Sequence, residues 1–219
     1  MTLAIKICGL TRVQDVHVAI EAGADALGFV FDRGPCILSL TQAEDLLGAL
    51  VRQRHPCLTV AVVGELSQER IAAIVNLGFD AVQAVESTYE AALAAQAPCV
   101  IPAFFDDDTL ASRVRAFRSR LAPAFDRRQG LLGGCVNVDG RGGGGAGNLT
   151  NWQVAAELAK EGPLMLAGGL TAANVATAIA TVQPAAVDVS SGVEAAPGVK
   201  DHAKMRAFVQ AARAAANRL

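Results

Sequence analysis

The feature that most constrains the fold is a regular alternation of short apolar runs with longer, alanine-rich segments of helical spacing. The apolar runs, which we predict to be strands, cover residues 3–8, 26–31, 58–63, 81–84, 99–103, 132–138, 163–167 and 186–189. They are continuous rather than alternating, which is typical of parallel strands buried on both faces. The predicted helices cover residues 13–21, 42–50, 68–76, 89–95, 110–120, 151–160, 172–181 and 202–215. This order predicts a closed (β/α)₈ TIM barrel, with an open doubly wound sheet as the alternative.

The length fits one such barrel, because barrels of this kind often contain about 200–250 residues. We therefore predict a single domain over residues 1–219. A glycine followed by one residue and then Asp-Ala precedes two of the predicted strands, starting at Gly23 and Gly78. Both glycines are expected to end a helix, which is a structural role.

Composition and charge exclude several classes of protein. Hydrophobic residues make up 52% of the chain and charged residues 18%, which favours a large core over disorder. The net charge of -2 and the absence of a basic cluster argue against a nucleic-acid partner. No apolar run approaches the roughly 20 residues that a membrane span needs, and the first residues lack a signal-peptide pattern. The expected location is therefore cytoplasmic, with no membrane partner.

The five cysteines are widely spaced, and no C-x-x-C pair is present. Neither a zinc site nor a disulfide framework is predicted from this pattern. Cys57, Cys99 and Cys135 are expected to be small buried hydrophobic residues. The acidic run at residues 106–108 is expected to be a solvated loop and helix cap rather than a metal site.

Two consecutive predicted strands end in loops that are rich in glycine and serine. Gly168 and Gly169 follow the seventh strand, and Ser190, Ser191 and Gly192 follow the eighth. Active sites of such barrels lie at the C-terminal ends of the strands, and the last two loops often hold a phosphate. Glycine lets backbone N–H groups approach an anion closely. These loops therefore predict a phosphate site, although two ordinary glycine turns would have the same sequence.

A thiol and a carboxyl group stand at the ends of two other predicted strands. Lys6 and Cys8 lie two residues apart, and therefore on one face of the first strand. Asp139 follows the sixth strand, on the far side of the barrel mouth. A base and an acid on opposite sides of a ligand can move a proton from one atom to another, which is isomerase chemistry. The residues alone also allow packing for Cys8 and a loop cap for Asp139.

The same segments resemble the phosphoribosylanthranilate isomerase family. The matching stretches are residues 6–11, 23–31, 80–83, 144–147 with Trp152, 166–170 and 187–194, followed by Pro-Gly and Lys-Asp at 197–198 and 200–201. They span nearly the whole chain, and residues 187–194 match best. The resemblance implies an enzyme of tryptophan biosynthesis that works without a metal or an organic cofactor. Its substrate would be a phosphorylated aminosugar, N-(5′-phosphoribosyl)anthranilate, converted by an Amadori rearrangement to 1-(2-carboxyphenylamino)-1-deoxyribulose 5-phosphate.

The resemblance also assigns roles to individual residues. Asp139 would be the general acid that opens the ribose ring, and Cys8 the general base that removes the C2 proton. Lys6 is expected to lower the pKa of Cys8. The sixth loop, with its run of glycines, is expected to close over the ligand. The predicted substrate-binding set is Lys6, Arg33, Gln83, Gly145, Gly147, Gly168, Gly169, Ser190, Ser191 and Gly192.

Three departures from the family pattern lie on the side of the anthranilate group. Cys36 stands where the family has an arginine expected to hold the anthranilate carboxylate, and Arg33 is the candidate replacement. Glu86 places a carboxylate where the family has a Gln-Leu-His-Gly stretch, and Asn148 replaces a lysine of the sixth loop. An isomerase for another phosphoribosylamine and a non-catalytic phosphosugar-binding barrel therefore stay open as alternatives. The sequence leaves both a monomer and a homodimer open.

Overall fold

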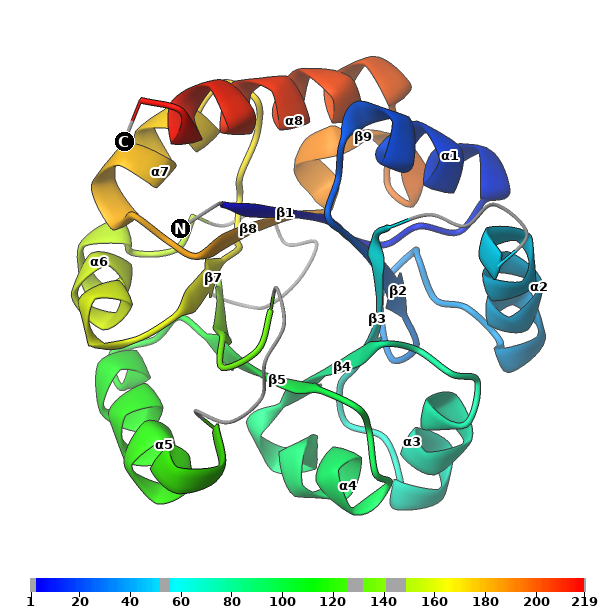
Figure 1. The fold of residues 1–219 in the computed structure, drawn as a ribbon, viewed down its shortest axis with the longest axis horizontal. Coiled ribbons are helices and arrows are strands. Elements are labelled where there is room, and N and C mark those ends of the chain that lie inside the picture. Colours follow the sequence, from blue (N-terminus) through cyan, green and yellow to red (C-terminus); the bar gives the residue numbers. More distant parts are fainter. Residues whose placement is uncertain (1–2, 52–55, 126–131, 141–148, 219) are drawn as a thin grey trace.

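The computed structural model describes residues 3–51, 56–125, 132–140 and 149–218 of the chain. Its eight parallel strands close into a barrel in sequence order, with the helices outside (Figure 1). The strands are β1 (Ala4–Ile7), β2 (Ala26–Val30), β3 (Leu58–Val63), β4 (Ala81–Val85), β5 (Val100–Phe105), β6 (Val136–Asp139), β7 (Leu164–Leu166) and β8 (Ala186–Val189). Four residues of β1 pair with four of β8, which closes the ring. The predicted barrel is confirmed, and the open-sheet alternative is wrong.

The helices follow the strands in the predicted alternation. They are α1 (Val13–Ala22), α2 (Leu40–Val51), α3 (Gln68–Val75), α4 (Tyr89–Ala94), α5 (Leu110–Phe125), α6 (Trp152–Glu161), α7 (Val175–Val182) and α8 (His202–Ala216). Two short 3₁₀ helices, η1 (Glu86–Thr88) and η2 (Ser191–Val193), and a hairpin of β9 (Glu194–Ala196) and β10 (Val199–Lys200) complete the described elements. No helix in the described ranges is long and apolar enough to cross a membrane.

Most predicted boundaries agree with the structure within two residues, and three do not. Strand β6 begins at Val136 rather than at 132, because the chain turns first and Gly134 adopts a positive φ of 73°. Helix α7 begins at Val175 rather than at 172, since Asn174 Oδ1 accepts the Thr171 N–H and holds a turn there. Helix α5 continues five residues past 120. Such local turns cannot be detected from helix propensity.

The two glycines predicted to end helices do so. Gly23 has a φ of 91°, and its N–H bonds to the carbonyls of Ala19 and Ile20. Gly78 has a φ of 87° and lies just after α3. Each is followed by an aspartate that enters the next strand, and Asp25 accepts the backbone N–H of Ile5 at 2.7 Å. The repeated pattern therefore serves to stop a helix and fix the next strand.

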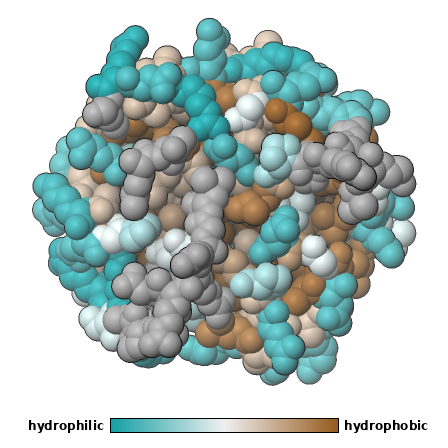
Figure 2. Space-filling model, in the orientation of Figure 1, coloured by the Kyte–Doolittle hydropathy of each residue, from teal (hydrophilic) through white to brown (hydrophobic). Residues whose placement is uncertain are grey.

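The inside of the barrel consists of layers, because alternate residues of each strand point inward. The layer nearest the N-terminal ends of the strands is apolar. It consists of Ala4, Ala26, Val60, Ala81, Ile101, Leu132, Cys135, Met165 and Ala186. The outward-facing strand residues, such as Phe29 and Phe104, pack beneath the helices. Hydrophilic side chains dominate the periphery of the molecule, while apolar ones gather between them (Figure 2).

Candidate active site

A cavity of about 480 Å³ opens at the C-terminal ends of the strands. Every strand of the barrel contributes to its wall, directly or through the loop that follows. Nine of the predicted site residues line it: Cys8, Arg33, Gln83, Asp139, Gly168, Gly169, Ser190, Ser191 and Gly192. Lys6 lies fully buried beneath this wall. Gly145 and Gly147 fall outside the described residues.

Cys8 follows β1 and is buried against β2. Its backbone N–H donates to the carbonyl of Val189 at 2.8 Å, which fixes it beside the end of β8. A Cβ added at Gly28 would lie 2.7 Å from the Cys8 sulfur and 3.0 Å from its Cα. A glycine on β2 is therefore what gives the thiol its space at the barrel mouth.

The thiol of Cys8 has a raised pKa. Burial is the main cause, and the negative charge of Asp188 acts in the same direction. Lys6 and Lys200 lower the pKa, but burial outweighs them. The prediction that Lys6 leaves Cys8 with a lowered pKa is therefore wrong for the net shift, although its sign is right for the interaction between the two residues. Sequence spacing identifies a nearby cation but not the desolvation of the thiol.

Asp139 ends β6 and faces the same cavity. Burial, followed by the nearby charge of Asp188, raises its pKa to about 6. The N–H of Gly140, 2.7 Å from Asp139 Oδ1, and the charge of Lys6 oppose that rise. A carboxyl group with this pKa retains its proton in part of the molecules near neutral pH. It can therefore act as a proton donor.

Lys6 and Asp188 form a buried ion pair beneath the cavity, with 2.8 Å between Nζ and Oδ2. Burial alone would lower the pKa of Lys6, but Asp188 and Cys8 together raise it. The ammonium group therefore stays charged without reaching the solvent. Lys6 compensates the negative charge of Asp188 from beneath the cavity. Asp188 is the member of the pair that lines the cavity wall.

Asn137 and Asp188 are among the polar residues of the wall that were not predicted as site residues. Asn137 is fully buried, and neither of its side-chain polar atoms has a hydrogen-bond partner among the described residues. Asp188 Oδ1 and Gln83 Oε1 are in the same state. Buried polar atoms are nearly always satisfied, so these atoms indicate contacts with a polar ligand or water. The signal in the sequence was their position, since Asn137 stands two residues before Asp139 and Asp188 two before Ser190.

The loop after β7 packs closely against the backbone on both sides, at the end of β6 and in the loop after β8. Gly168 has a φ of 85°, and a Cβ there would lie 2.3 Å from the Gly140 nitrogen. A Cβ at Gly192 would lie 1.8 Å from the Leu170 carbonyl oxygen. These two glycines are therefore required by close contact. The serines at 190 and 191 and the glycines at 169 and 192 all face the cavity from this side.

The opposite side of the mouth contains one cation among the residues described as lining it. The Arg33 guanidinium lies 5.7 Å from the centre of the Phe105 ring, and its Nε donates to Asp32 at 2.9 Å. Cys36 is buried, and its sulfur lies 3.7 Å from Glu194 Oε1. Burial raises the pKa of Cys36 to about 11, so it stays a neutral thiol, and a cysteine has no cationic form that could replace an arginine.

The carboxylate of Glu86, the second departure from the family pattern, does not reach the described cavity wall. Glu86 forms an ion pair with Arg113 on α5, and Arg113 also pairs with Asp107 at 2.8 Å. Glu86 is absent from the described cavity wall. Its charge is compensated outside the site. Asn148, the third departure, falls outside the described residues.

The fold and the site define a class: a (β/α)₈ barrel with a buried acid, a buried thiol and two glycine-serine loops around one cavity. A family model described as N-(5′-phosphoribosyl)anthranilate isomerase matches residues 5–211. The chain belongs to this family.

Individual relatives agree with the family match. The N-(5′-phosphoribosyl)anthranilate isomerase of Geotalea uraniireducens is 39% identical over 220 residues, with 95% of this chain and 98% of that protein covered. The crystal structure of phosphoribosyl anthranilate isomerase from Thermotoga maritima has a TM-score of 0.81 at 30% identity, covering 97% of this chain and 99% of that one. Another isomerase structure, in complex with reduced 1-(o-carboxyphenylamino)-1-deoxyribulose 5-phosphate, has a TM-score of 0.79 at 29% identity, with the same coverage.

Proposed function

We propose that this chain is a phosphoribosylanthranilate isomerase of tryptophan biosynthesis. It would convert N-(5′-phosphoribosyl)anthranilate to 1-(2-carboxyphenylamino)-1-deoxyribulose 5-phosphate. The observation that carries the proposal is that Cys8 and Asp139 line one cavity from β1 and β6, beside two loops suited to a phosphate. Family membership names the reaction, and this geometry supplies its acid and its base.

Asp139 is the general acid of the first step. Its pKa of about 6 keeps a proton available, and its position on β6 directs that proton into the cavity. Protonation of the furanose ring oxygen lets the C1–O bond break while the aniline nitrogen donates its electron pair to C1. The product is an open-chain sugar with a protonated Schiff base. Asp139 is left as a carboxylate.

Cys8 is the general base of the second step. Its raised pKa disfavours the thiolate in the free protein, but the protonated Schiff base brings a positive charge next to it. That charge stabilises the thiolate and makes the C2 proton more acidic. Transfer of this proton to the sulfur gives an enolamine, which becomes the ketone when C1 gains a proton and the C2 hydroxyl loses one. Lys6 and Lys200 favour the same charge state of the thiol.

One end of the cavity suits the phosphate of the substrate, and the opposite end contains Arg33 as the one cation among the described lining residues. The loops holding Gly169, Ser190 and Gly192 would bind the phosphate through N–H and hydroxyl groups. Gln83, Asn137 and Asp188 present unsatisfied polar atoms to the sugar between the two ends.

A cytoplasmic location stays a prediction. A homodimer is supported by one solved relative described as dimeric, and a monomer remains the alternative.

The direct test measures turnover of N-(5′-phosphoribosyl)anthranilate by the purified protein. Loss of the substrate and appearance of the ketone product are the two readouts. We also expect the gene to restore growth of a tryptophan auxotroph that lacks only this step. Phosphate binding without turnover would favour a non-catalytic barrel.

One observation favours a second candidate, an isomerase acting on a different phosphoribosylamine. Cys36 cannot form the bidentate pair with a carboxylate that an arginine forms. An assay of phosphoribosylamines with and without an aromatic carboxylate separates the two candidates. The anthranilate isomerase requires a clear preference for the carboxylate, and equal rates would support the second candidate.

A further inference from the structure

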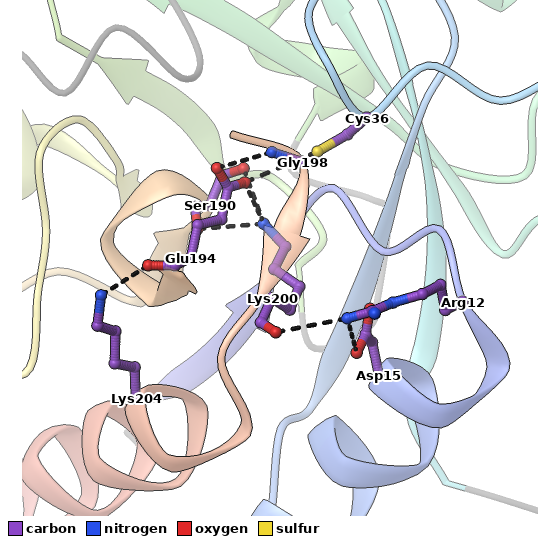
Figure 3. A network of polar contacts seen from close by, with 8 residues as sticks. All are labelled: Arg12, Asp15, Cys36, Ser190, Glu194, Gly198, Lys200 and Lys204. Atoms are coloured by element: carbon purple, nitrogen blue, oxygen red, sulfur yellow. Dashed lines mark hydrogen bonds and ion pairs between the residues drawn. The ribbon is translucent and has the colours of Figure 1, made fainter. Parts of the chain in front are cut away.

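The hairpin after β8 contains a buried lysine that transfers no proton in the proposed mechanism and whose hydrogen bonds that mechanism leaves unexplained. Lys200 lies on β10, and its side chain has no exposed surface. Its ammonium group contacts three oxygens: Glu194 Oε1 at 2.8 Å, the Ser190 carbonyl at 3.1 Å and Ser190 Oγ at 3.3 Å (Figure 3). These are as many acceptors as the group has protons to donate.

Two of these contacts fix the first residue of the glycine-serine loop. The C=O and N–H of a trans peptide point in opposite directions. Because the Ser190 carbonyl is directed at Lys200, the N–H of the same peptide, that of Ser191, points away from Lys200. Ser190 and Ser191 line the cavity, whereas Lys200 is absent from its described wall. Lys200 therefore contacts the cavity only through this loop, although its charge also lowers the pKa of the Cys8 thiol.

The third contact compensates a carboxylate that also faces the cavity. Glu194 has one oxygen on Lys200, and its other oxygen accepts the Gly198 N–H at 3.2 Å. Lys204 on α8 donates to the Glu194 carbonyl at 2.6 Å, and Arg12, the residue before α1, donates to the Lys200 carbonyl at 3.4 Å. These hydrogen bonds attach the hairpin to α8 and to the start of α1. They therefore fix the position of the Lys200 ammonium group relative to the loop after β8.

We propose that Lys200 is the positioning residue of the phosphate site: its buried ammonium holds Ser190 so that the N–H groups of the following loop face the ligand. This inference rests on the proposed function, in which that loop binds the substrate phosphate. A buried ammonium bonded to a peptide carbonyl also polarises that peptide and strengthens its N–H as a donor to an anion. Lys200 does not touch the reacting atoms, so binding should depend on it more than the chemical step.

The test compares Lys200→Met with the wild type and with Lys204→Met, a matched loss of a lysine from the same hairpin contact network. We expect Lys200→Met to raise KM for the substrate, and Ki for inorganic phosphate, by about 10- to 100-fold, the size of a lost hydrogen bond to a charged group. kcat should change less than about threefold. Lys204→Met should leave KM and Ki near wild type.

A second variant separates positioning from charge and avoids an uncompensated buried carboxylate. Lys200→Met/Glu194→Gln removes both charges, and it should fold but keep the weak phosphate binding. A return of this double variant to wild-type KM would overturn the positioning role, since charge compensation alone would then explain the effect. Lys200→Met with KM and Ki within about twofold of wild type would overturn it as well. A wild type that neither turns over substrate nor binds phosphate would instead contradict the proposed function.

Discussion

The two inward-facing layers of the barrel share one backbone pattern and have opposite chemistry. In the lower layer, residues such as Ala26, Val60 and Ile101 form an apolar plug. Two residues further along the strands, Lys6, Gln83, Asn137 and Asp188 form a buried polar layer. The backbone does not impose this difference, because strands such as β1 and β8 pass through both layers with residues of each on the same inward face.

The comparison separates residues that stabilise the barrel from residues that the site needs. Buried apolar side chains stabilise at roughly 25 cal/mol per Å². Buried charges are costly even when paired, and the Lys6–Asp188 pair is weak evidence for stability. The upper layer therefore has its composition because of what it does at the cavity. Four changes test this division, from the largest expected effect to the smallest.

Removal of the acid or the base from the mouth should abolish most activity while leaving the fold intact. Cys8→Ser and Asp139→Asn are each expected to lower kcat by about 10²- to 10⁴-fold, the usual contribution of a positioned proton-transfer group. Steady-state kinetics with the anthranilate substrate measures this, and circular dichroism checks the fold. Either variant retaining more than about a tenth of the rate would remove that residue from the mechanism.

Breaking the ion pair in the upper layer should destabilise the protein. Lys6→Met leaves Asp188 buried without its partner, and we expect a loss of about 3–5 kcal/mol in the free energy of unfolding. Lys6→Met/Asp188→Leu removes both charges from the layer and should recover most of that stability without recovering activity. Urea unfolding measures both variants. A double variant as unstable as Lys6→Met would show that the pair itself stabilises the barrel.

The raised pKa of Asp139 links activity and stability to pH. A carboxyl that must be protonated to act makes kcat/KM fall as pH rises through about 6, the pKa of Asp139. Because this pKa is higher in the folded protein than in the unfolded chain, the folded state binds the proton more tightly. Stability is then greatest below the unfolded pKa of about 4 and is lost as pH rises toward 6.

Asp139→Asn removes this dependence. It should be more stable than wild type by about 3 kcal/mol at pH 8, with the difference vanishing below about pH 4. Thermal and urea unfolding across this pH range measure the effect. A constant difference between the two proteins at every pH would assign the gain to something other than ionisation.

A small deletion in the lower layer should have the smallest effect, and on stability alone. Ile101 is fully buried in that layer, and Ile101→Val is expected to cost about 0.5–1.5 kcal/mol. KM and kcat should stay at wild-type values. A change in the kinetic constants would show that the two layers are coupled, and that the lower layer does not contribute to stability alone.

Much of the fold could be predicted, because a barrel of parallel strands leaves a strong local signal. Continuous apolar strands, alanine-rich helices and helix-ending glycines such as Gly23 gave the order of elements, and the structure confirms it. The boundaries of β6 and α7 were wrong where a turn depends on a single positive φ or one side-chain hydrogen bond. Such features involve few residues and leave no periodicity to detect.

The site was predicted in part for the same reason. Residues at strand ends, such as Cys8, Asp139 and Gly168, could be assigned to the mouth because all parallel strands end on one side. Asn137 and Asp188 were missed, since their importance comes from burial without a partner. The net shift of the Cys8 pKa was missed because desolvation depends on everything packed around the sulfur.

The sequence by itself determined the barrel, its family and the residues that meet at its mouth, because these depend on periodicity and on the direction of the strands. Only the tertiary structure decided that Glu86 is compensated by Arg113, that Cys36 is neutral beside Glu194, and that Lys200 lies under the eighth loop. Charge compensation and burial are set by distances between segments far apart in the chain. Those distances exist only once the barrel has closed.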